Sequence, residues 1–437
     1  MMGPELALAI LLAGFVLLIA VGIPLAFALL FASAFVIALD PGLDAVIVPL
    51  RIFSGVNSFV LLAIPGFMFS AFLMNRIGVT EDIVALSDLL VGRIRGGLAH
   101  INVVASMLLG GVSGSSTADV AGLGAILIPA MSQKGYDKGF SAAITAASSA
   151  IGSIIPPSIL MVIYGASANV SVGALFIAGY IPGILVGLQQ IAIGYWYARR
   201  HGIGAERQER APGDALRVLL RGIVPMSTMV VIIGGIIGGI MTATEAAAVA
   251  AAYVALIGAF FYRTLTVRIL LEVAAETGRL TAVVMLCVGT ATIFGWLMAY
   301  YHILEVAGGL FQQFATGPVT YLLFVAAVFL FLGTFMDPAP AMLVFVPVIA
   351  PIADQLAVHP LVLGIVVVMT LSIGKITPPY GISLLLACTI AQVPLSASMR
   401  WTMVFLVAFC LLVAALILWP GITLMLPRLL VPELAGG

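Results

Sequence analysis

The chain has 437 residues, of which 63% are hydrophobic and only 8% charged, and its 18 basic side chains balance 18 acidic ones. Soluble globular proteins carry about 25% charged residues, so this composition excludes a soluble enzyme, a nucleic-acid-binding protein, a secreted disulfide scaffold and a disordered protein. It predicts an integral membrane protein. The apolar runs are long and continuous, which predicts helices rather than a barrel, because a helix satisfies its own backbone in lipid.

Uncharged stretches predict where helices cross the membrane, because about 20 apolar residues span the hydrocarbon core. The first, Leu6–Leu39, is counted as one crossing, although Gly22 and Pro24 indicate a kink or a break into two helices. Ile52–Asn75 predicts the next crossing, and Gly139–Ala198, with 60 residues, is long enough for two. The crossings predicted after residue 220 are Gly222–Thr244, Ala246–Tyr262, Leu280–Leu304, Ile376–Met399 and Trp401–Pro427.

Two further uncharged stretches are interrupted by an acidic residue: Gly96–Ala118 is followed by Asp119, and Val306–Met336 is followed by Asp337. The stretches beyond these acids have only 14 and 16 residues, which is too short to cross without tilt. Each first arm ends in glycine and small polar residues. We therefore predict two re-entrant hairpins, whose non-helical tips are tolerated at that depth only where they are buried or line a cavity.

The distribution of basic residues sets the orientation. With nine crossings and two hairpins, 15 Lys and Arg residues lie on one side, Arg51 and Arg428 lie on the other, and Lys375 falls inside the membrane. This bias predicts that the first side is cytoplasmic. The first hairpin then opens to the cytoplasm and the second to the far side, and the hydrophilic stretch at 201–220 is a cytoplasmic linker.

Two parts of the chain resemble each other at an offset of 222 residues. Ile151–Pro157 and Ile373–Pro379 share five of seven residues, and the same offset aligns Pro129 with Pro351 and Gly111 with Gly333. Since the charge distribution places them in opposite orientations, we predict an all-α polytopic membrane protein of two inverted repeats, each with a re-entrant hairpin and a Pro-Pro-broken helix, the architecture of elevator-type ion transporters. The predicted division is 1–200 for the first repeat, with its hairpin at about 97–133 and its broken helix at about 139–168, then the linker at 201–220, then 221–430 for the second repeat, with its hairpin at about 318–356 and its broken helix at about 360–388.

Paired prolines in the middle of an apolar span remove helix donors and disfavour helix before them. The freed carbonyl groups of Gly152–Ile155 need a partner, and a bare cation is a good one because hard cations take oxygen ligands. Hydroxyl groups that could complete such shells are those of Ser115, Ser116, Ser148 and Ser149 and, beside Gly333 and Gly374, those of Thr334, Thr370 and Thr377. The alternative is an ordinary proline kink, which two matched breaks with hairpin tips at matched distances disfavour.

Three charged residues are predicted within the membrane, where such groups are costly and usually functional. Asp119 is either a cation ligand or a helix cap, since Ser116 stands three residues before it as in a capping box. Asp337 begins a hairpin arm in the same way. Lys375 either pairs with a substrate carboxylate or extends to the membrane interface.

These motifs resemble the large membrane subunit of tripartite ATP-independent periplasmic (TRAP) transporters over essentially the whole chain. The matching runs are Gly110–Asp119, Ile151–Ser158, Thr242–Ala246 and Ile373–Gly381. The resemblance implies a sodium-coupled importer of small organic acids, of the C4-dicarboxylate, keto acid or sugar acid class, which works by an elevator motion in the bacterial inner membrane and is not an enzyme. A periplasmic solute-binding protein would deliver the substrate, a small four-helix membrane subunit would brace the scaffold in the bilayer, and no nucleic acid is involved.

The residue chemistry and the resemblance together predict two or more sodium sites at the two breaks and hairpin tips. The expected cation-site residues are Ser115, Ser116, Asp119, Ser149, Gly152, Ile155, Pro156, Gly333, Asp337, Thr370, Gly374, Thr377 and Pro378. The expected substrate-binding residues are Ser116, Ser158, Lys375 and Tyr380. Lys375 departs from the family pattern, in which an uncharged residue is expected, and its ammonium group could weaken or replace one sodium ion.

Three other functions share some of these features. A dicarboxylate symporter or antiporter of similar hairpin architecture would transport without any binding protein. An intramembrane aspartyl protease would use two acids, but Asp119 follows Ala118 and Asp337 follows Met336, rather than the Gly-x-Gly-Asp and Tyr-Asp contexts usual in such enzymes. A channel is disfavoured because paired hairpins from opposite sides indicate alternating access.

Overall fold

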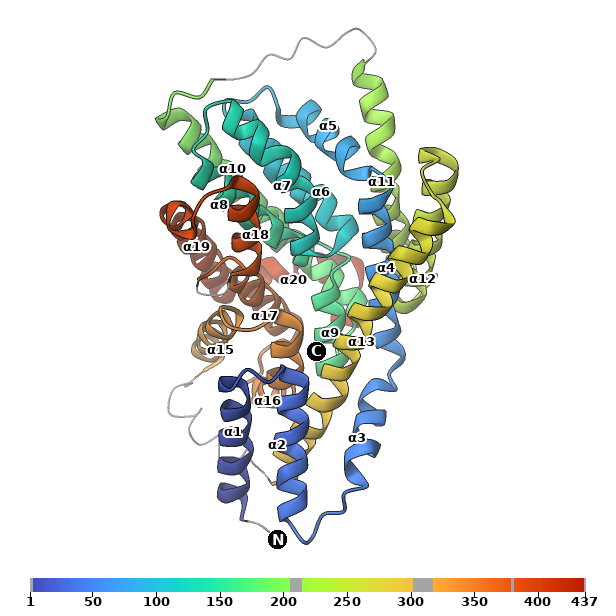
Figure 1. Ribbon diagram of the computed structural model, residues 1–437, viewed down its shortest axis with the longest axis vertical. Helices are drawn as coiled ribbons and strands as arrows, with labels where there is room; N and C mark the ends of the chain where they lie inside the picture. The colour runs from blue at the N-terminus through green and yellow to red at the C-terminus, as the bar shows by residue number, and fades with distance from the viewer. Residues whose placement is uncertain (1–2, 205–213, 302–316, 379–380, 436–437) are drawn as a thin grey trace.

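The computed structural model describes residues 3–204, 214–301, 317–378 and 381–435, and all its regular elements are helical (Figure 1). The predicted all-α fold class is confirmed for this part of the chain. Seven of the described helices are long and apolar enough to cross a membrane, in agreement with a multi-pass membrane protein. Part of the predicted linker, the start of the window before the second hairpin, and the Pro379 and Tyr380 positions lie outside the described residues.

The helices of the first half follow one another with few connecting residues. They are α1 (Pro4–Ala20), α2 (Leu25–Leu39), α3 (Ile47–Val56), η1 (Phe59–Leu62), α4 (Ala63–Arg76), α5 (Val79–Val91), α6 (Gly97–Ser113), α7 (Ser116–Gln133), α8 (Lys138–Ser149), η2 (Ala150–Ser153), α9 (Ile159–Ala168) and α10 (Val172–Arg200).

The second half has a similar density of helices. They are α11 (Asp214–Ile237), α12 (Ala243–Leu256), η3 (Ile257–Tyr262), α13 (Val267–Tyr300), α15 (Pro318–Gly333), α16 (Pro338–Gln355), α17 (Pro360–Gly374), α18 (Ile382–Ala391), α19 (Leu395–Leu418), α20 (Pro420–Leu430) and α21 (Pro432–Ala435).

The first uncharged window forms two antiparallel helices, α1 and α2, which pack against each other (Figure 1). Gly22 closes α1 in the left-handed conformation with φ +88°, which glycine adopts without strain, and Pro24 stands directly before α2. The two helices have 17 and 15 residues and return to the same end of the molecule. The single crossing counted from the sequence is therefore wrong here, and the break is the alternative that the structure contains.

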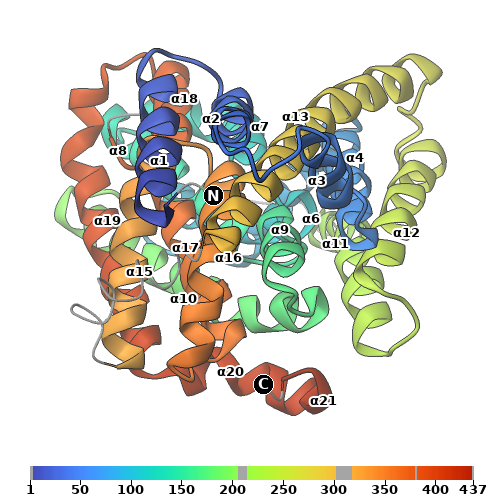
Figure 2. The same cartoon turned by 90° about the horizontal axis from the view of Figure 1, so that it is seen from below.

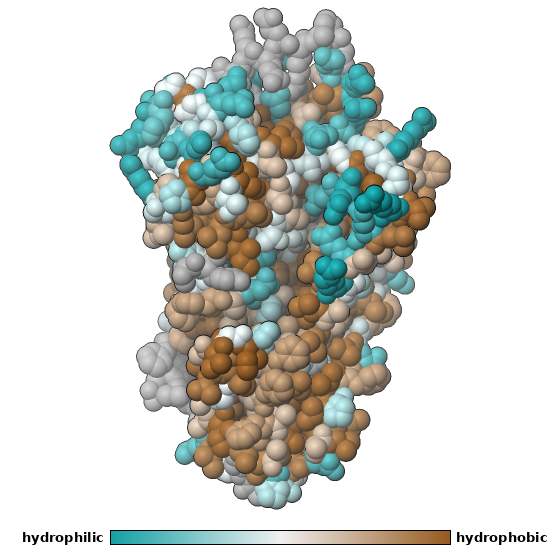
Figure 3. Space-filling view, in the orientation of Figure 1, coloured by the Kyte–Doolittle hydropathy of each residue, from teal (hydrophilic) through white to brown (hydrophobic). Residues whose placement is uncertain are grey.

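The two ends of the molecule differ in polarity. In Figure 3, hydrophilic residues gather over the upper part, where α5, the end of α10 and the start of α11 lie, and the lower part is largely hydrophobic. The upper end carries Arg199 and Arg200, and Arg95 donates a hydrogen bond from its Nε to the carbonyl of Ile203 at 3.0 Å. By the positive-inside rule this end is the cytoplasmic one.

The two hairpins, α6–α7 and α15–α16, open toward opposite ends of the molecule. The start of α6 lies at the cytoplasmic end, because Gly96 packs against Ala198 near the end of α10. In the second hairpin, Pro347 of α16 lies beside Gly295 in the lower part of α13. Opposite entry is the orientation expected for inverted repeats; the repeat relation itself stays a prediction.

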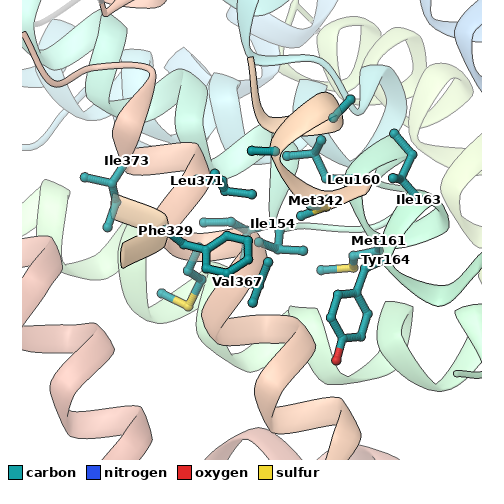
Figure 4. Close-up of a cluster of buried hydrophobic side chains, with 14 of the residues drawn as sticks. Ile154, Leu160, Met161, Ile163, Tyr164, Phe329, Met342, Val367, Leu371 and Ile373 are labelled. Carbon is teal, nitrogen blue, oxygen red and sulfur yellow. The ribbon is translucent and has the colours of Figure 1, made fainter. Parts of the chain in front are cut away.

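Each hairpin packs against the broken helix of the other half of the chain. α7 contacts α18, and α16 contacts α9. Between them lies a core of buried apolar side chains that joins the first break to the second hairpin and α17 (Figure 4). The side chains labelled there come from the first break and α9 (Ile154, Leu160, Met161, Ile163, Tyr164) and from α15, α16 and α17 (Phe329, Met342, Val367, Leu371, Ile373). Hairpins and broken helices therefore form one packed body.

A second group of helices surrounds this body on one side. α13 contacts α2, α3 and α4, α4 contacts α12, and α11 contacts α5 and α12. Seen from below, α11 and α12 lie beyond α13 at one edge of the molecule, and α15 and α19 lie at the opposite edge (Figure 2). The long α13 thus packs against α16 of the hairpin body, and α4, α5 and α11 also contact the body directly through α6.

The uncharged windows misplace several later helices. Ile376–Met399 is not one crossing, because it contains α18 and the first turn of α19. Arg400 lies inside α19, where its guanidinium stacks over the Trp401 ring at 5.2 Å, so a charge near a helix end does not mark the boundary of the helix. Trp401–Pro427 is divided between α19 and α20, and α11 begins at Asp214, within the range predicted for the linker.

A buried hydrogen bond fastens the lower end of α13 to α2. The Tyr301 hydroxyl, just after α13, donates to Asp40 Oδ2 at 2.7 Å, and both residues are buried. We expect Tyr301→Phe to lower the free energy of unfolding by about 1–3 kcal/mol, because a buried acceptor loses a donor. The measurement is the apparent Tm of the purified protein in detergent. The neighbouring Tyr300→Phe is the matched control and should leave the Tm unchanged; equal shifts would show that the bond contributes nothing specific.

Candidate functional site

The first proline pair interrupts the helical backbone in the interior of the protein. α8 ends at Ser149, one 3-10 turn follows as η2, and residues 154–158 are not helical before α9 begins at Ile159. The Ser158 hydroxyl donates to the Ser153 carbonyl at 2.6 Å and accepts from the Met161 amide at 3.4 Å, so it bridges the two half-helices. The predicted break is therefore present, and every residue from 150 to 158 is buried.

The tip of the first hairpin closes over this break. Gly114 turns the chain with φ +60° between α6 and α7, and the carbonyl of Pro157 lies against it. A Cβ on Gly110 would stand 2.5 Å from the Cα of Gly152, so the two backbones are in direct contact. Only glycine permits such an approach. The hairpin and the broken helix thus meet through their main chains.

Polar groups gather where these two backbones meet. The hydroxyl groups of Ser116 and Ser153 lie 2.5 Å apart and share a hydrogen bond. The carboxylate of Asp119 is fully buried and rests against Gly152, where a Cβ would collide with it. The capping box expected between Ser116 and Asp119 is not formed, because Ser115 is the N-cap of α7 and its side chain makes no cap hydrogen bond.

The second break repeats the backbone contact of the first. α17 ends at Gly374, whose Cα would lie 3.0 Å from a Cβ on Gly333 at the end of α15. The matching contact in the first half is made by Gly110, so the alignment of Gly111 with Gly333 is one residue out of register. Gly111 instead faces the Pro156 carbonyl and Met229 of α11.

The side chains at the second break differ from those at the first. Asp337 is exposed and caps α16 by accepting a hydrogen bond from the Ala339 amide at 3.2 Å. The Thr377 hydroxyl donates to the Ile373 carbonyl at 2.9 Å. Lys375 is half-buried, and within the described residues its ammonium group forms no ion pair. Pro378 is half-buried at the edge of the described segment, and Tyr380 lies outside it.

The remaining expected site residues are placed less centrally. Ser149 and Thr370 are buried and donate hydrogen bonds to carbonyl groups of their own helices. The Ile155 side chain packs against Gly183 of α10, so only its main chain is available as a ligand. Ser115 lies at the hairpin tip but lines a cavity beside it. The structure therefore brings Ser116 and Asp119 of α7 against Ser153 and Gly152 of η2, whereas the hydroxyl groups of Ser149 and Thr370 bond within their own helices.

Ser148 takes part in a different arrangement. Its hydroxyl donates to Asn102 Oδ1 at 3.0 Å and accepts from Ser106 Oγ at 2.9 Å, and Asn102 donates to the Thr145 hydroxyl at 2.7 Å. All four side chains are buried and satisfy one another. This network fastens the first arm of the hairpin to α8, and it explains Ser148 without a bound ion.

The donor set at the first break suits a hard cation. One carboxylate lies against Gly152, the hydroxyl pair of Ser116 and Ser153 joins the same two segments, and hard cations take oxygen ligands. The described residues contain no cluster of three His, Cys, Asp or Glu side chains that would hold a transition metal. The second break offers fewer oxygen donors and has a lysine beside it, so the two halves are not equivalent.

Sequence reasoning missed two features of this region. Ser153 stands in the repeated motif, but only the folded hairpin reveals its bond to Ser116. The cavity beside the tip, about 530 Å³ in volume, is lined by residues from α4, α5, α7, α9 and α13, among them Arg76 and Glu276. Residues so distant in sequence leave no motif that could have revealed the cavity.

Comparisons with known proteins agree along the whole chain. The family model described as the DctM component of tripartite ATP-independent periplasmic transporters matches residues 12–422. The sialic acid TRAP transporter large permease protein of Vibrio cholerae is 35% identical over 95% of this chain and 97% of its own length. The C4-dicarboxylate TRAP transporter large permease protein of Pseudomonas aeruginosa is 35% identical over 87% of this chain and 88% of its own.

A further relative and one solved structure extend the comparison. The 2,3-diketo-L-gulonate TRAP transporter large permease protein of Escherichia coli is 31% identical over 90% of this chain and 93% of its own. The crystal structure of the Alcanivorax borkumensis YdaH transporter matches with a TM-score of 0.64 at 15% identity and covers 91% of this chain and 96% of its own. At that identity the match shows a shared fold alone.

The Gly110–Gly152 contact gives a direct test of how the tip meets the break. We expect Gly110→Ala to lower the free energy of unfolding by about 1–3 kcal/mol, because the added methyl group must push two backbones apart. The apparent Tm of the purified variant measures this. Gly234→Ala in α11 is the control, since nothing lies within 4 Å of the new methyl group there. Its Tm should be equal or higher, and a Gly110→Ala variant as stable as this control would contradict the close packing.

Proposed function

Because the chain belongs to the family of the DctM component of tripartite ATP-independent periplasmic transporters, we propose that it imports small organic anions by coupling their movement to sodium. Family membership makes it a permease subunit of the bacterial inner membrane and not an enzyme. Three of its relatives are named for sialic acid, C4-dicarboxylates and 2,3-diketo-L-gulonate, which are organic acids. The proposed substrate is an acid of this class: a C4-dicarboxylate, a keto acid or a sugar acid.

One observation carries the sodium coupling: Asp119 is buried against Gly152 beside the hydroxyl pair of Ser116 and Ser153. A sodium ion bound here would take the buried carboxylate, the two serine hydroxyl oxygens and the proposed Pro156 carbonyl as ligands, which are the hard oxygen donors that such ions prefer. Each serine hydroxyl that donates elsewhere still presents its oxygen lone pairs. The first sodium site is therefore assigned to Ser115, Ser116, Asp119, Gly152, Ile155 and Pro156, with Ser149 further out.

A second sodium site is proposed at the other break, around Gly333, Asp337, Thr370, Gly374, Thr377 and Pro378. Asp337 accepts its capping bond from Ala339 on Oδ1, which leaves Oδ2 to join this site. Lys375 stands where Ser153 stands in the first motif, and a like charge there weakens a cation site. The second site is thus the weaker of the two. The substrate would bind between the breaks at Ser116, Ser158, Lys375 and Tyr380.

The proposed motion is an elevator movement of the hairpin body against the outer helices. The body consists of the two hairpins and two broken helices, which share one core. Cavities of about 460 and 530 Å³ lie between it and α13, the first toward the lower end and the second toward the cytoplasmic end. Two such cavities along one sliding surface support alternating access.

The energetics favour more than one coupled sodium. Each positive charge that moves inward down a membrane potential gains about 2.3 kcal/mol per 100 mV. A dicarboxylate loses the equivalent of two charges, so two sodium ions make its entry electroneutral and their concentration gradient then drives accumulation. Sodium and substrate each raise the affinity of the other if both favour the closed hairpin.

The proposed partners are a periplasmic solute-binding protein and a small four-helix membrane subunit. The binding protein would deliver the substrate at the lower end, and the small subunit would stiffen the outer helices. The second candidate function, a symporter or antiporter that needs no binding protein, is compatible with the same fold. The full-length match to TRAP permeases favours the first.

Uptake into proteoliposomes distinguishes the two candidate functions, with and without a binding protein. The full chain is reconstituted with its small subunit, and uptake of labelled N-acetylneuraminate, succinate and 2,3-diketogulonate is measured with and without sodium and with and without the binding protein. We expect uptake of at least one acid to require both sodium and the binding protein. Uptake that persists without the binding protein would favour the second candidate, and uptake that ignores sodium would refute the coupling.

Substitution of Ser116 tests the first sodium site. We expect Ser116→Ala to raise the half-saturating sodium concentration for uptake about tenfold, which corresponds to about 1.4 kcal/mol of lost binding. Ser87→Ala in α5 is the matched control, because Ser87 is also buried but only donates to the Ile83 carbonyl of its own helix. A wild-type sodium dependence in Ser116→Ala would remove this residue from the site.

A further inference from the structure

The cytoplasmic cavity has a composition suited to an organic anion. One wall is formed by the hairpin tip and the start of α9, with Ser115, Thr117 and Ile159. The opposite wall is formed by α4 and α13, with Asn75, Arg76 and Glu276. Its volume of about 530 Å³ would hold an acid of moderate size. It therefore combines moving and static elements with one arginine.

Arg76 is the basic residue that lines this cavity, and its ion pairs with two glutamates are weak. It ends α4, and its guanidinium lies 3.6 Å from Glu272 and 3.5 Å from Glu276, two residues one turn apart on α13. The Arg76 side chain is 51% exposed. Exposed pairs at such distances contribute little to stability. A carboxylate that approaches Arg76 with bidentate geometry would form a better pair than either glutamate.

Uncharged polar groups stand beside the arginine. Asn75 Oδ1 is buried near Gly122 of α7 and has no hydrogen-bond partner among the described residues. The hydroxyl groups of Ser115 and Thr117 lie 3.4 Å apart at the hairpin tip. An acid bound at Arg76 would therefore meet hydroxyl donors at the hairpin tip, and the Asn75 oxygen would accept only from a hydroxyl or amide hydrogen of the ligand.

We propose that this cavity is the cytoplasmic release site for the substrate and that Glu276 competes with the substrate carboxylate for Arg76. The proposal rests on the organic-acid transport proposed above. Arrival of the acid exchanges one carboxylate for another at Arg76, and departure restores the Glu276 pair. Because the competitor is part of the chain, it is always present at high effective concentration and keeps the inward-facing affinity low. Release on the cytoplasmic side is thereby favoured over rebinding.

A purely structural ion pair makes a different prediction. If the pair only joins α4 to α13, loss of either partner weakens the same contact, and the two substitutions act in the same direction. If Glu276 is a competitor, loss of Arg76 lowers the affinity for the acid and loss of Glu276 raises it. The sign of the Glu276 effect therefore decides between the two.

The experiment measures affinity at the inner face by counterflow. Proteoliposomes with the reconstituted transporter and binding protein are loaded with unlabelled N-acetylneuraminate, succinate or 2,3-diketogulonate at a series of concentrations, and entry of the same labelled acid is followed. The half-saturating internal concentration is compared between wild type and variants. We expect Arg76→Gln to raise it at least tenfold and Glu276→Gln to lower it several-fold.

Two further variants complete the test. In the double variant with Arg76→Gln, the added Glu276→Gln should change nothing, because the residue it competes for is gone. Arg93→Gln is the matched control, since Arg93 is exposed, lies outside the cavity and, in the described part of the chain, shares no glutamate with Arg76; it should behave as wild type.

The possible outcomes are distinct. Equal effects of Arg76→Gln and Arg93→Gln, or effects of the same sign for Arg76→Gln and Glu276→Gln, would overturn the release site while wild-type transport stands. Failure of the wild type to exchange any of the three acids would instead refute the proposed organic-acid function, and the release site with it.

Discussion

Inside a bilayer no water completes the hydrogen bonds of a backbone that leaves the helical conformation, so the chain must supply partners of its own. The region around Pro156 and Pro157 shows how this requirement shapes the protein. The Ser158 hydroxyl donates a hydrogen bond to the Ser153 carbonyl, and Gly114 at the hairpin tip lies against the Pro157 carbonyl. Every residue of the break is buried. The hairpin is needed because the break exists. The same unwinding that needs protection also leaves oxygen atoms where a small ion can reach them.

Glycine residues allow the backbone of each hairpin to approach the backbone of the broken helix closely. At both breaks a glycine of the hairpin touches a glycine of the broken helix, Gly110 with Gly152 and Gly333 with Gly374. With the backbones in contact, the side chains around them can diverge without loss of the architecture. They have done so here: the first break has a buried acid and a serine pair, whereas the second has an exposed capping acid and a lysine. The two proposed ion sites, built on one backbone plan, would thus differ in affinity for the same ion.

The sequence predicted the features that depend on local chemistry. Prolines and glycines act on their own stretch of backbone, so the breaks after Ser149 and Gly374 and the hairpin ends near Gly97, Gln133 and Gln355 were placed within a few residues. Uncharged windows were less reliable, because Arg400 sits inside α19 and because Leu6–Leu39 folds back on itself. Contacts between segments that are distant in the sequence could not be predicted from it. The Gly110 register, the Ser116–Ser153 bond and the cavity at Arg76 each depend on helices that meet only in the folded chain.

The strength of electrostatic interactions at the two ends of the proposed substrate path depends on how deeply the charged residues are buried. Near the break, Asp119 is fully buried, so a charge there interacts strongly with whatever neutralises it. Near the cytoplasmic end, Arg76 and its glutamates are about half exposed, and water screens their attraction. A charged ligand near the buried break needs an opposite charge beside it. Near the half-exposed cytoplasmic end water can screen the same charge, so an ion pair is not required there. In the proposed mechanism, tight coupling of ion and substrate at depth and easy exchange at the surface both follow from this difference in burial, and a transporter needs both to move its substrate in one direction.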